Sequence, residues 1–243
     1  MSNKINTVTG KAASRTQLNI TSNTPNENLG VVRSIREDIV NVLRKDPAAR
    51  HLLEVLLVYP GIHALILHRL SYWLWQHKFK LVARIIALLG RWWTGIEIHP
   101  AARIGRRLMI DHGLGIVVGE TAQIGDDVTM YHGVTLGGTR WDPVKRHPTV
   151  GNNVLLGAGA KVLGAITVGD GVKVGANAVV TRDVPDNVTV VGIPARIIGH
   201  SKPAAAEFDD VGKETACILK FCKKPPLELS TTKEALNSRC GRQ

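Results

Sequence analysis

The feature that most constrains this chain is an apolar residue that recurs every six positions through its second half. Ile98, Ile104 and Ile110 begin the series, which then slips by two residues and continues over 118–136 and, after a gap, over 150–180. An α-helix has a period of about 3.6 residues and a half-buried strand a period of 2, so neither explains this spacing. A recurring unit of fixed length indicates a repeat architecture.

A parallel β-helix with triangular coils satisfies the six-residue period. Each hexapeptide would form one short strand and one corner, with the anchor pointing inward and a small or apolar residue, such as Ala102, packing beneath it four positions later. Glycine, which often follows the anchor as at Gly105, would permit the backbone of the corner. Three hexapeptides would make a coil of about 18 residues, and coils would stack about 4.8 Å apart.

The remaining segments differ in composition, so the chain is predicted to be an α+β protein with four parts. Residues 1–30 are polar and expected to be a disordered arm, 31–96 a helical domain, 97–199 the β-helix, and 200–243 a flexible tail. Asp46 before Pro47 predicts a helix start at Pro47, with further helices near 62–77 and 81–92. The polar segment 137–149 interrupts the repeat and is expected to be an extruded, functional loop.

Charge and cysteine content exclude several classes of protein. The net charge is +11, but most of the excess lies in 31–96 without interleaved aromatic residues, which favours a solvated basic face over a nucleic-acid site. All three cysteines lie in the last part of the chain, so no disulfide scaffold is expected. The apolar stretch 55–67 is too short to cross a bilayer, and the first residues lack the apolar core of a signal peptide. We therefore expect a soluble cytoplasmic protein that contacts no membrane.

Two histidines occupy equivalent places in the repeat. His112 and His132 each lie two residues after an anchor, which predicts that they share a corner on adjacent coils. Glu97 precedes Ile98, so its equivalent one coil on is expected about three residues from His112, and Asp111 is its direct neighbour. A carboxylate beside an imidazole can orient it and stabilise its cationic form, which suits general base catalysis.

A metal site is the alternative use of these histidines. His112, His132 and His147 could form a three-histidine zinc site similar to that of hexapeptide-repeat carbonic anhydrases. Those proteins take two ligands from a short His-x4-His spacing, which the repeat region here lacks. We therefore expect no metal.

Several segments together resemble one family. GIEIHPAARIG, IDHGLGIVVGETAQIG, VTLGGTRWDPVKRHPTVG, LLGAGAKVLG and GIPARIIG are similar to serine O-acetyltransferases, over residues 46–199. The resemblance implies a left-handed parallel β-helix of hexapeptide repeats that forms a homotrimer with active sites between subunits. It implies transfer of the acetyl group of acetyl-CoA to L-serine, giving O-acetylserine for cysteine biosynthesis.

The resemblance also implies roles for individual residues. His112 would be the general base, supported by Glu97 at a position where family members more often carry Asp. Asp46 and Asp111 would bind the amino group of serine, and Arg146 and His147 its carboxylate. The pantetheine groove, where small side chains let the thioester arm approach the backbone, would be lined by Gly138, Thr139, Ala158 and Ala176.

Two alternatives to a serine acetyltransferase stay open at the level of sequence. One is an acetyltransferase for another small hydroxylated acceptor, such as homoserine or a sugar. The other is a non-catalytic regulatory partner of cysteine synthase. In the family that complex uses a terminal Ile, whereas this chain ends in Arg242 and Gln243, so no stable complex of this kind is expected.

Overall fold

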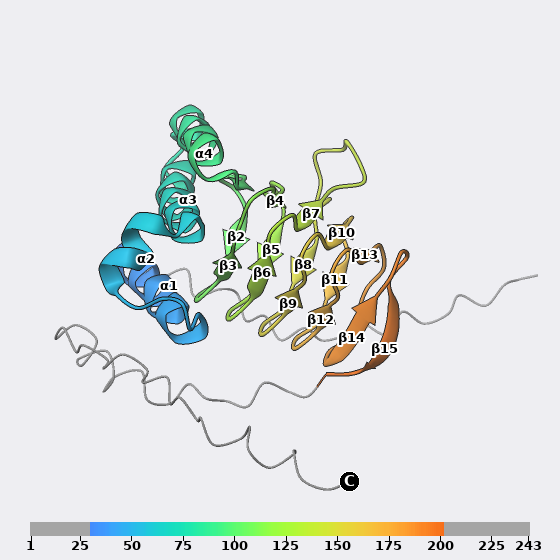
Figure 1. Cartoon of the computed structure of the whole chain (residues 1–243). Helices are drawn as coiled ribbons and strands as arrows, with labels where there is room; N and C mark the ends of the chain where they lie inside the picture. Colours follow the sequence, from blue (N-terminus) through green and yellow to red (C-terminus); the bar gives the residue numbers. More distant parts are fainter. Residues whose placement is uncertain (1–29, 202–243) are drawn as a thin grey trace, which may run out of the picture. The chain divides into compact units, whose positions relative to one another are not determined.

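The computed structural model describes residues 30–201, which form a small helical bundle followed by a β-helix (Figure 1). Most of the expected arm and tail, including all three cysteines, lies outside the described residues. The helices are α1 (Val31–Lys45), α2 (Leu52–Val58), α3 (Pro60–Gln76) and α4 (Lys80–Thr94). The first strands are β1 (Glu97–Ile98), β2 (Arg103–Ile104), β3 (Met109–Asp111), β4 (Val117–Val118), β5 (Gln123–Ile124), β6 (Thr129–Tyr131) and β7 (Thr135–Gly137).

A loop separates these strands from the rest of the β-helix and projects from it in Figure 1. The later strands are β8 (Thr149–Val150), β9 (Leu155–Leu156), β10 (Lys161–Leu163), β11 (Thr167–Val168), β12 (Lys173–Val174), β13 (Val179–Val180), β14 (Val188–Val191) and β15 (Arg196–His200).

The strands form three sheets, one on each side of the triangular coil. Sheet A has the order β1-β4-β7-β10-β13, sheet B β11-β8-β5-β2, and sheet C β15-β14-β12-β9-β6-β3. All pairings are parallel except that of β14 with β15. Val118 pairs with Leu136 and Leu156 with Val174, 18 residues apart. The two-residue slip lengthens one coil, so that Ile110 pairs with Met130.

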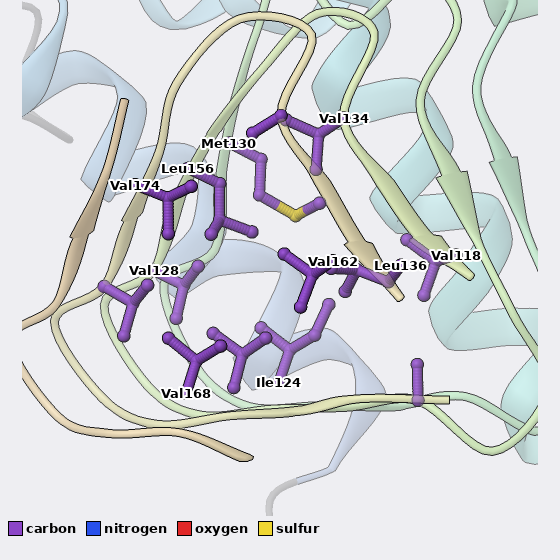
Figure 2. Close-up of a cluster of buried hydrophobic side chains, with 14 of the residues drawn as sticks. Val118, Ile124, Val128, Met130, Val134, Leu136, Leu156, Val162, Val168 and Val174 are labelled. Carbon is purple, nitrogen blue, oxygen red and sulfur yellow. The ribbon is translucent and has the colours of Figure 1, made fainter. Parts of the chain in front are cut away.

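The interior of the coil is filled by the anchors and by the small or apolar residues four positions after them. Figure 2 shows these side chains pointing inward from the three sides. All thirteen anchors from Ile98 to Val180 are buried, which confirms the predicted inward direction. The core continues into α3 through Ala64 and Leu65, while a second buried cluster lies within the bundle and consists of Ile39, Val42, Val55 and Ile62.

The glycines that follow the anchors are explained by crowding and not, as expected, by corner conformation. Gly105 and Gly125 lie outside the left-handed region, but a Cβ at either position would fall within about 2.7 Å of the backbone of the next coil. Positive φ values occur instead at Gly113, Gly133 and Gly159, which lie in the corners. A side chain at Gly105 or Gly125 would therefore push adjacent coils apart.

The start of the second helix differs from the expectation. Asp46 ends α1, and α2 begins only at Leu52. The Asp46 side chain caps a turn instead, because its Oδ1 accepts a hydrogen bond of 2.8 Å from the N–H of Ala48. An aspartate before proline satisfies such a turn as readily as a helix start, so the local pattern alone does not separate the two.

A buried polar network attaches the helices to the first coil. Arg69 of α3 lies 3.2 Å from the carboxylate of Asp38 and donates two hydrogen bonds of 2.6 Å to the carbonyls of Ile104 and Gly105. Asn41 of α1 donates to the carbonyl of Arg107. Because these bonds use carbonyl groups at the edge of sheet B, the helical bundle closes this end of the β-helix.

Candidate active site

One corner of the coil carries His112, and we call it the His112 corner. It follows the strands of sheet C, so that His112, His132, Ala158 and Ala176 lie one above another, each two residues after a buried anchor. The rings of His112 and His132 are 6.0 Å apart and nearly perpendicular. The prediction that these two histidines share a corner on adjacent coils is confirmed. The His112 side chain is 74% exposed and therefore accessible to a substrate.

The backbone at His112 is constrained to an uncommon conformation. His112 has a φ of 59° and Gly113 a φ of 70°, at the point where the chain slips by two residues. For a residue other than glycine this region costs of the order of 1 kcal/mol or more, and it persists only where the surroundings enforce it. Gly113 packs so closely on Ile96 that a Cβ would lie 2.5 Å from its Cδ1. The two extra residues and the close packing of Gly113 thus fix the direction in which the His112 side chain projects from the corner.

Glu97 does not occupy the register that was expected. Its equivalent one coil on is Val117, five residues from His112, because the slip adds two residues to this coil. The Glu97 carboxylate lies 3.0 Å from Nη1 of Arg91 at the end of α4. The carboxylate recorded beside the imidazole is that of Asp111, with Oδ1 3.8 Å from Nε2 of His112.

Asp46 is held by Tyr59, a residue that the sequence analysis did not single out. Tyr59, between α2 and α3, donates a 2.7 Å hydrogen bond to Oδ2 of Asp46. Burial, followed by the hydrogen bond and charge of Asp46, raises the pKa of Tyr59 to about 12, and the charges of Glu54 and Asp111 add to the shift. Tyr59 is therefore a hydrogen-bond donor throughout the neutral range, within a group of carboxylates.

A second corner carries Arg146, and we call it the Arg146 corner. It follows the strands of sheet A, and Gly138 and Thr139 lie where the chain leaves β7 for the loop. Arg146, near the end of that loop, places Nη2 2.7 Å from Oε2 of Glu120 and donates from Nη1 to the carbonyl of Asp142 at 3.1 Å. Sequence reasoning missed Glu120, which directly follows an anchor and its glycine, because nothing local to the repeat shows that the loop returns to it.

His147 is held beside Arg146 in one tautomer. Its Nδ1 accepts a 3.2 Å hydrogen bond from the N–H of Thr121, so the proton of the neutral ring lies on Nε2. The ring is 8% exposed and packs over Gly119, where a Cβ would lie 2.0 Å from it. Burial, and then the charge of Arg146, lowers the pKa of His147. At neutral pH this side chain is a neutral donor through Nε2 next to a guanidinium, a combination suited to a carboxylate.

The two corners are separate within one chain. The His112 corner lies between sheets C and A, and the Arg146 corner between sheets A and B, so the strands of sheet A separate them. Asp46, Asp111, Ala158 and Ala176 belong with His112, whereas Gly138, Thr139 and His147 belong with Arg146. A single chain therefore does not bring all the expected site residues together. The three histidines of the metal alternative are divided in the same way within one chain, with His112 and His132 at one corner and His147 at the other.

No group of three His, Cys, Asp or Glu side chains in the described part of the chain could hold a metal ion. No single helix within residues 30–201 is long and apolar enough to cross a membrane; α2 and α3 together reach that length and apolar composition, but the chain bends by 75° between them.

Comparisons with known proteins place the chain in a family. The model of the serine acetyltransferase N-terminal region matches residues 1–66, and that of the bacterial transferase hexapeptide (six repeats) matches 147–182. A serine acetyltransferase of Helicobacter pylori is 62% identical over 65% of this chain and 92% of its own length. One of Bacillus subtilis is 55% identical over 87% of this chain and 99% of its own.

Solved structures agree with these relatives. The serine acetyltransferase of Brucella abortus in complex with coenzyme A has a TM-score of 0.69 at 44% identity, covering 71% of this chain and 69% of that one. The Neisseria gonorrhoeae enzyme in complex with serine has a TM-score of 0.67 at 38% identity, covering 70% and 69%. The hexapeptide β-helix, the helices before it and the similarity over nearly the whole length of curated relatives together show that the chain belongs to the serine acetyltransferase family.

Proposed function

We propose that this chain transfers the acetyl group of acetyl-CoA to the hydroxyl of L-serine, releasing O-acetylserine and CoA for cysteine biosynthesis. The curated relatives are serine acetyltransferases, and related enzymes have been solved with coenzyme A and with serine. We assign roles to the residues because the site is divided into two corners. The Arg146 corner is basic, and the His112 corner is acidic. A zwitterionic amino acid needs opposed charges of this kind at its two ends.

His112 is assigned the role of general base. It takes the proton from the serine hydroxyl as the oxygen attacks the carbonyl carbon of the thioester, and the proton passes to the CoA sulfur as the C–S bond breaks. An imidazole can both accept a proton and return it, so one side chain can perform both transfers. The exposure of His112 and the nearby carboxylate of Asp111 support this role. Glu97 is assigned a supporting role, in which its negative charge assists His112. This role requires the Glu97 carboxylate to give up its ion pair with Arg91 when substrate binds.

The two ends of serine are assigned to the two corners. Asp46 and Asp111, both half-buried, present carboxylates for the ammonium group next to His112. Arg146 and the Nε2–H of His147 present donors for the carboxylate, and the guanidinium fork suits a planar anion. The thioester arm of acetyl-CoA would pass between Gly138 and Thr139 of one corner and Ala158 and Ala176 of the other.

Because the two corners lie on different sides of sheet A, the proposal requires sites formed between neighbouring chains, and we propose that the assembly is a homotrimer. The His112 corner of one subunit would face the Arg146 corner of the next, as closed threefold symmetry allows. Light scattering should then show a trimer. A stable and active monomer would rule out this arrangement.

A mixing experiment tests the division of the site directly. Trimers of His112→Ala and trimers of Arg146→Ala should each be impaired. A trimer that contains both kinds of subunit has one intact site, so a random 1:1 mixture refolded together should recover about a quarter of the wild-type rate. If both residues of a site came from the same chain, no mixed trimer would regain activity.

Acceptor identity is tested by thiol release from acetyl-CoA with a panel of alcohols. L-serine should be the best acceptor, and clear turnover of homoserine or a sugar without turnover of serine would replace the proposed substrate. The cytoplasmic location expected from the sequence belongs to the same proposal, and fractionation of cells would test it.

A further inference from the structure

Tyr59 contacts one of the two carboxylates that are assigned to the amino group of serine, that of Asp46. Its hydroxyl donates to Oδ2 of Asp46 at 2.7 Å, while the N–H of Ala48 donates to Oδ1 at 2.8 Å. The charge of Asp111 also acts on the phenol. Each oxygen of the Asp46 carboxylate is therefore held by one hydrogen bond, and its plane is fixed.

The backbone around Tyr59 cannot move easily. Pro60 is the first residue of α3 and fixes its own φ, and Gly61 packs against β3 so closely that a Cβ would lie 2.5 Å from the carbonyl oxygen of Ile110. Ile110 directly precedes Asp111. The start of α3 thus sets the position of Tyr59 relative to the strand that carries Asp111 and leads to His112.

The hydrogen-bonding capacity of Asp46 leaves room for a substrate. A carboxylate has about four acceptor positions, and Tyr59 and Ala48 use two of them. The remaining positions can accept from an ammonium group without breaking either bond. The other acidic side chains near Tyr59, Glu54 and Asp111, make this region favourable for a cation.

We propose that Tyr59 is a positioning residue, which holds the Asp46 carboxylate in the orientation that binds the amino group of the acceptor. Tyr59 acts through Asp46 and takes no part in the transfer of the acetyl group. It therefore contributes to the preference for an amino acid over a hydroxy acid that lacks the amino group. This inference rests on the proposed function, since it assumes that Asp46 faces the amino group of serine.

The test compares Tyr59→Phe with the wild type on two acceptors, L-serine and 3-hydroxypropanoate, which has the same hydroxyl and carboxylate but no amino group. Loss of a hydrogen bond to a charged group should raise KM for serine roughly tenfold, with kcat changed by less than about twofold. The kcat/KM for 3-hydroxypropanoate and the KM for acetyl-CoA should stay within about twofold of wild type. Tyr72→Phe in α3, whose ring contacts His68, is the matched control and should change none of these values.

A double-mutant cycle separates positioning from a general structural effect. In an Asp46→Ala background, Tyr59→Phe should raise KM for serine by less than about twofold, because the group it positions is gone. Three results would overturn the inference: an unchanged KM for serine in Tyr59→Phe, an equal loss on both acceptors, or full additivity with Asp46→Ala. Failure of the wild type to acetylate serine would instead defeat the proposed function itself, so the two failures are distinguishable.

Discussion

Replacing Gly61 by alanine should destabilise this protein, although alanine is the better residue in most helices. The exchange gains up to about 1 kcal/mol in helix propensity. Here, however, the new methyl group would lie 2.5 Å from the carbonyl oxygen and 2.9 Å from Cβ of Ile110, where ordinary contacts begin near 3.4 Å. The obstacle is strand backbone, so α3 must move away from β3. Overpacking of this kind costs about 1–3 kcal/mol, and we expect a net loss of roughly 1–2 kcal/mol.

Gly90 of α4 is the matched control for this substitution. A Cβ there would lie 3.3 Å from Cδ1 of Leu67, the flexible end of a side chain that can rotate away. Gly90→Ala should therefore be neutral or slightly stabilising. Denaturant unfolding of both variants at the same protein concentration is the assay. The reasoning would be refuted by a Gly61→Ala variant that is as stable as wild type, or by equal effects of the two substitutions.

Three further predictions concern the site and the pH dependence of stability. His112→Ala should lower kcat about 10² to 10⁴-fold with little change in KM for acetyl-CoA, and retention of half the rate would show that another group is the base. Arg146→Ala should raise KM for serine roughly 10–150-fold, and a matching loss with an acceptor that lacks a carboxylate would contradict its assignment. Burial raises the pKa of Asp38 from 3.8 to about 6 against the opposing charge of Arg69, so the folded state binds this proton more tightly than the unfolded chain. The associated stability is complete below about pH 4 and is lost as the pH rises through 6. Between pH 4 and 7, the free energy of unfolding of the wild type should therefore fall relative to that of Asp38→Asn by up to about 3 kcal/mol. Denaturant unfolding of both proteins measures this difference, and a difference that stays constant over this pH range would contradict the prediction.

The β-helix could be predicted from the sequence because its period depends on each residue's place within one short repeat. An anchor such as Val162 must point inward whatever its neighbours do, and all thirteen anchors are buried. The same local rule placed His112 and His132 in one corner. It failed for Glu97, whose partner in the next coil depends on where the chain inserts its two extra residues.

The missing parts of the candidate site depend on contacts between distant segments. Glu120 meets Arg146 only because the loop after β7 returns to the preceding coil, and Tyr59 meets Asp46 only because α2 and α3 turn back toward the end of α1. The six-residue period of the sequence gives no information about either of these contacts. Within α1, Asp38 and Asn41 are buried as well, and their polar partners also lie far along the chain, at Arg69 and at the carbonyl of Arg107.

The helices close the first coil of the β-helix, and this limits how copies of the chain can assemble. At the first coil the carbonyls of Ile104 and Gly105 are bound by Arg69, and Gly61 rests on Ile110. At the last coil β15 covers β14 in an antiparallel pair. A stack of parallel strands with open ends could polymerise end to end into a fibre. In the described part of the chain, the helices block such growth at the first coil, so a fibre that adds subunits at both ends is disfavoured and a ring that closes through the lateral faces is not.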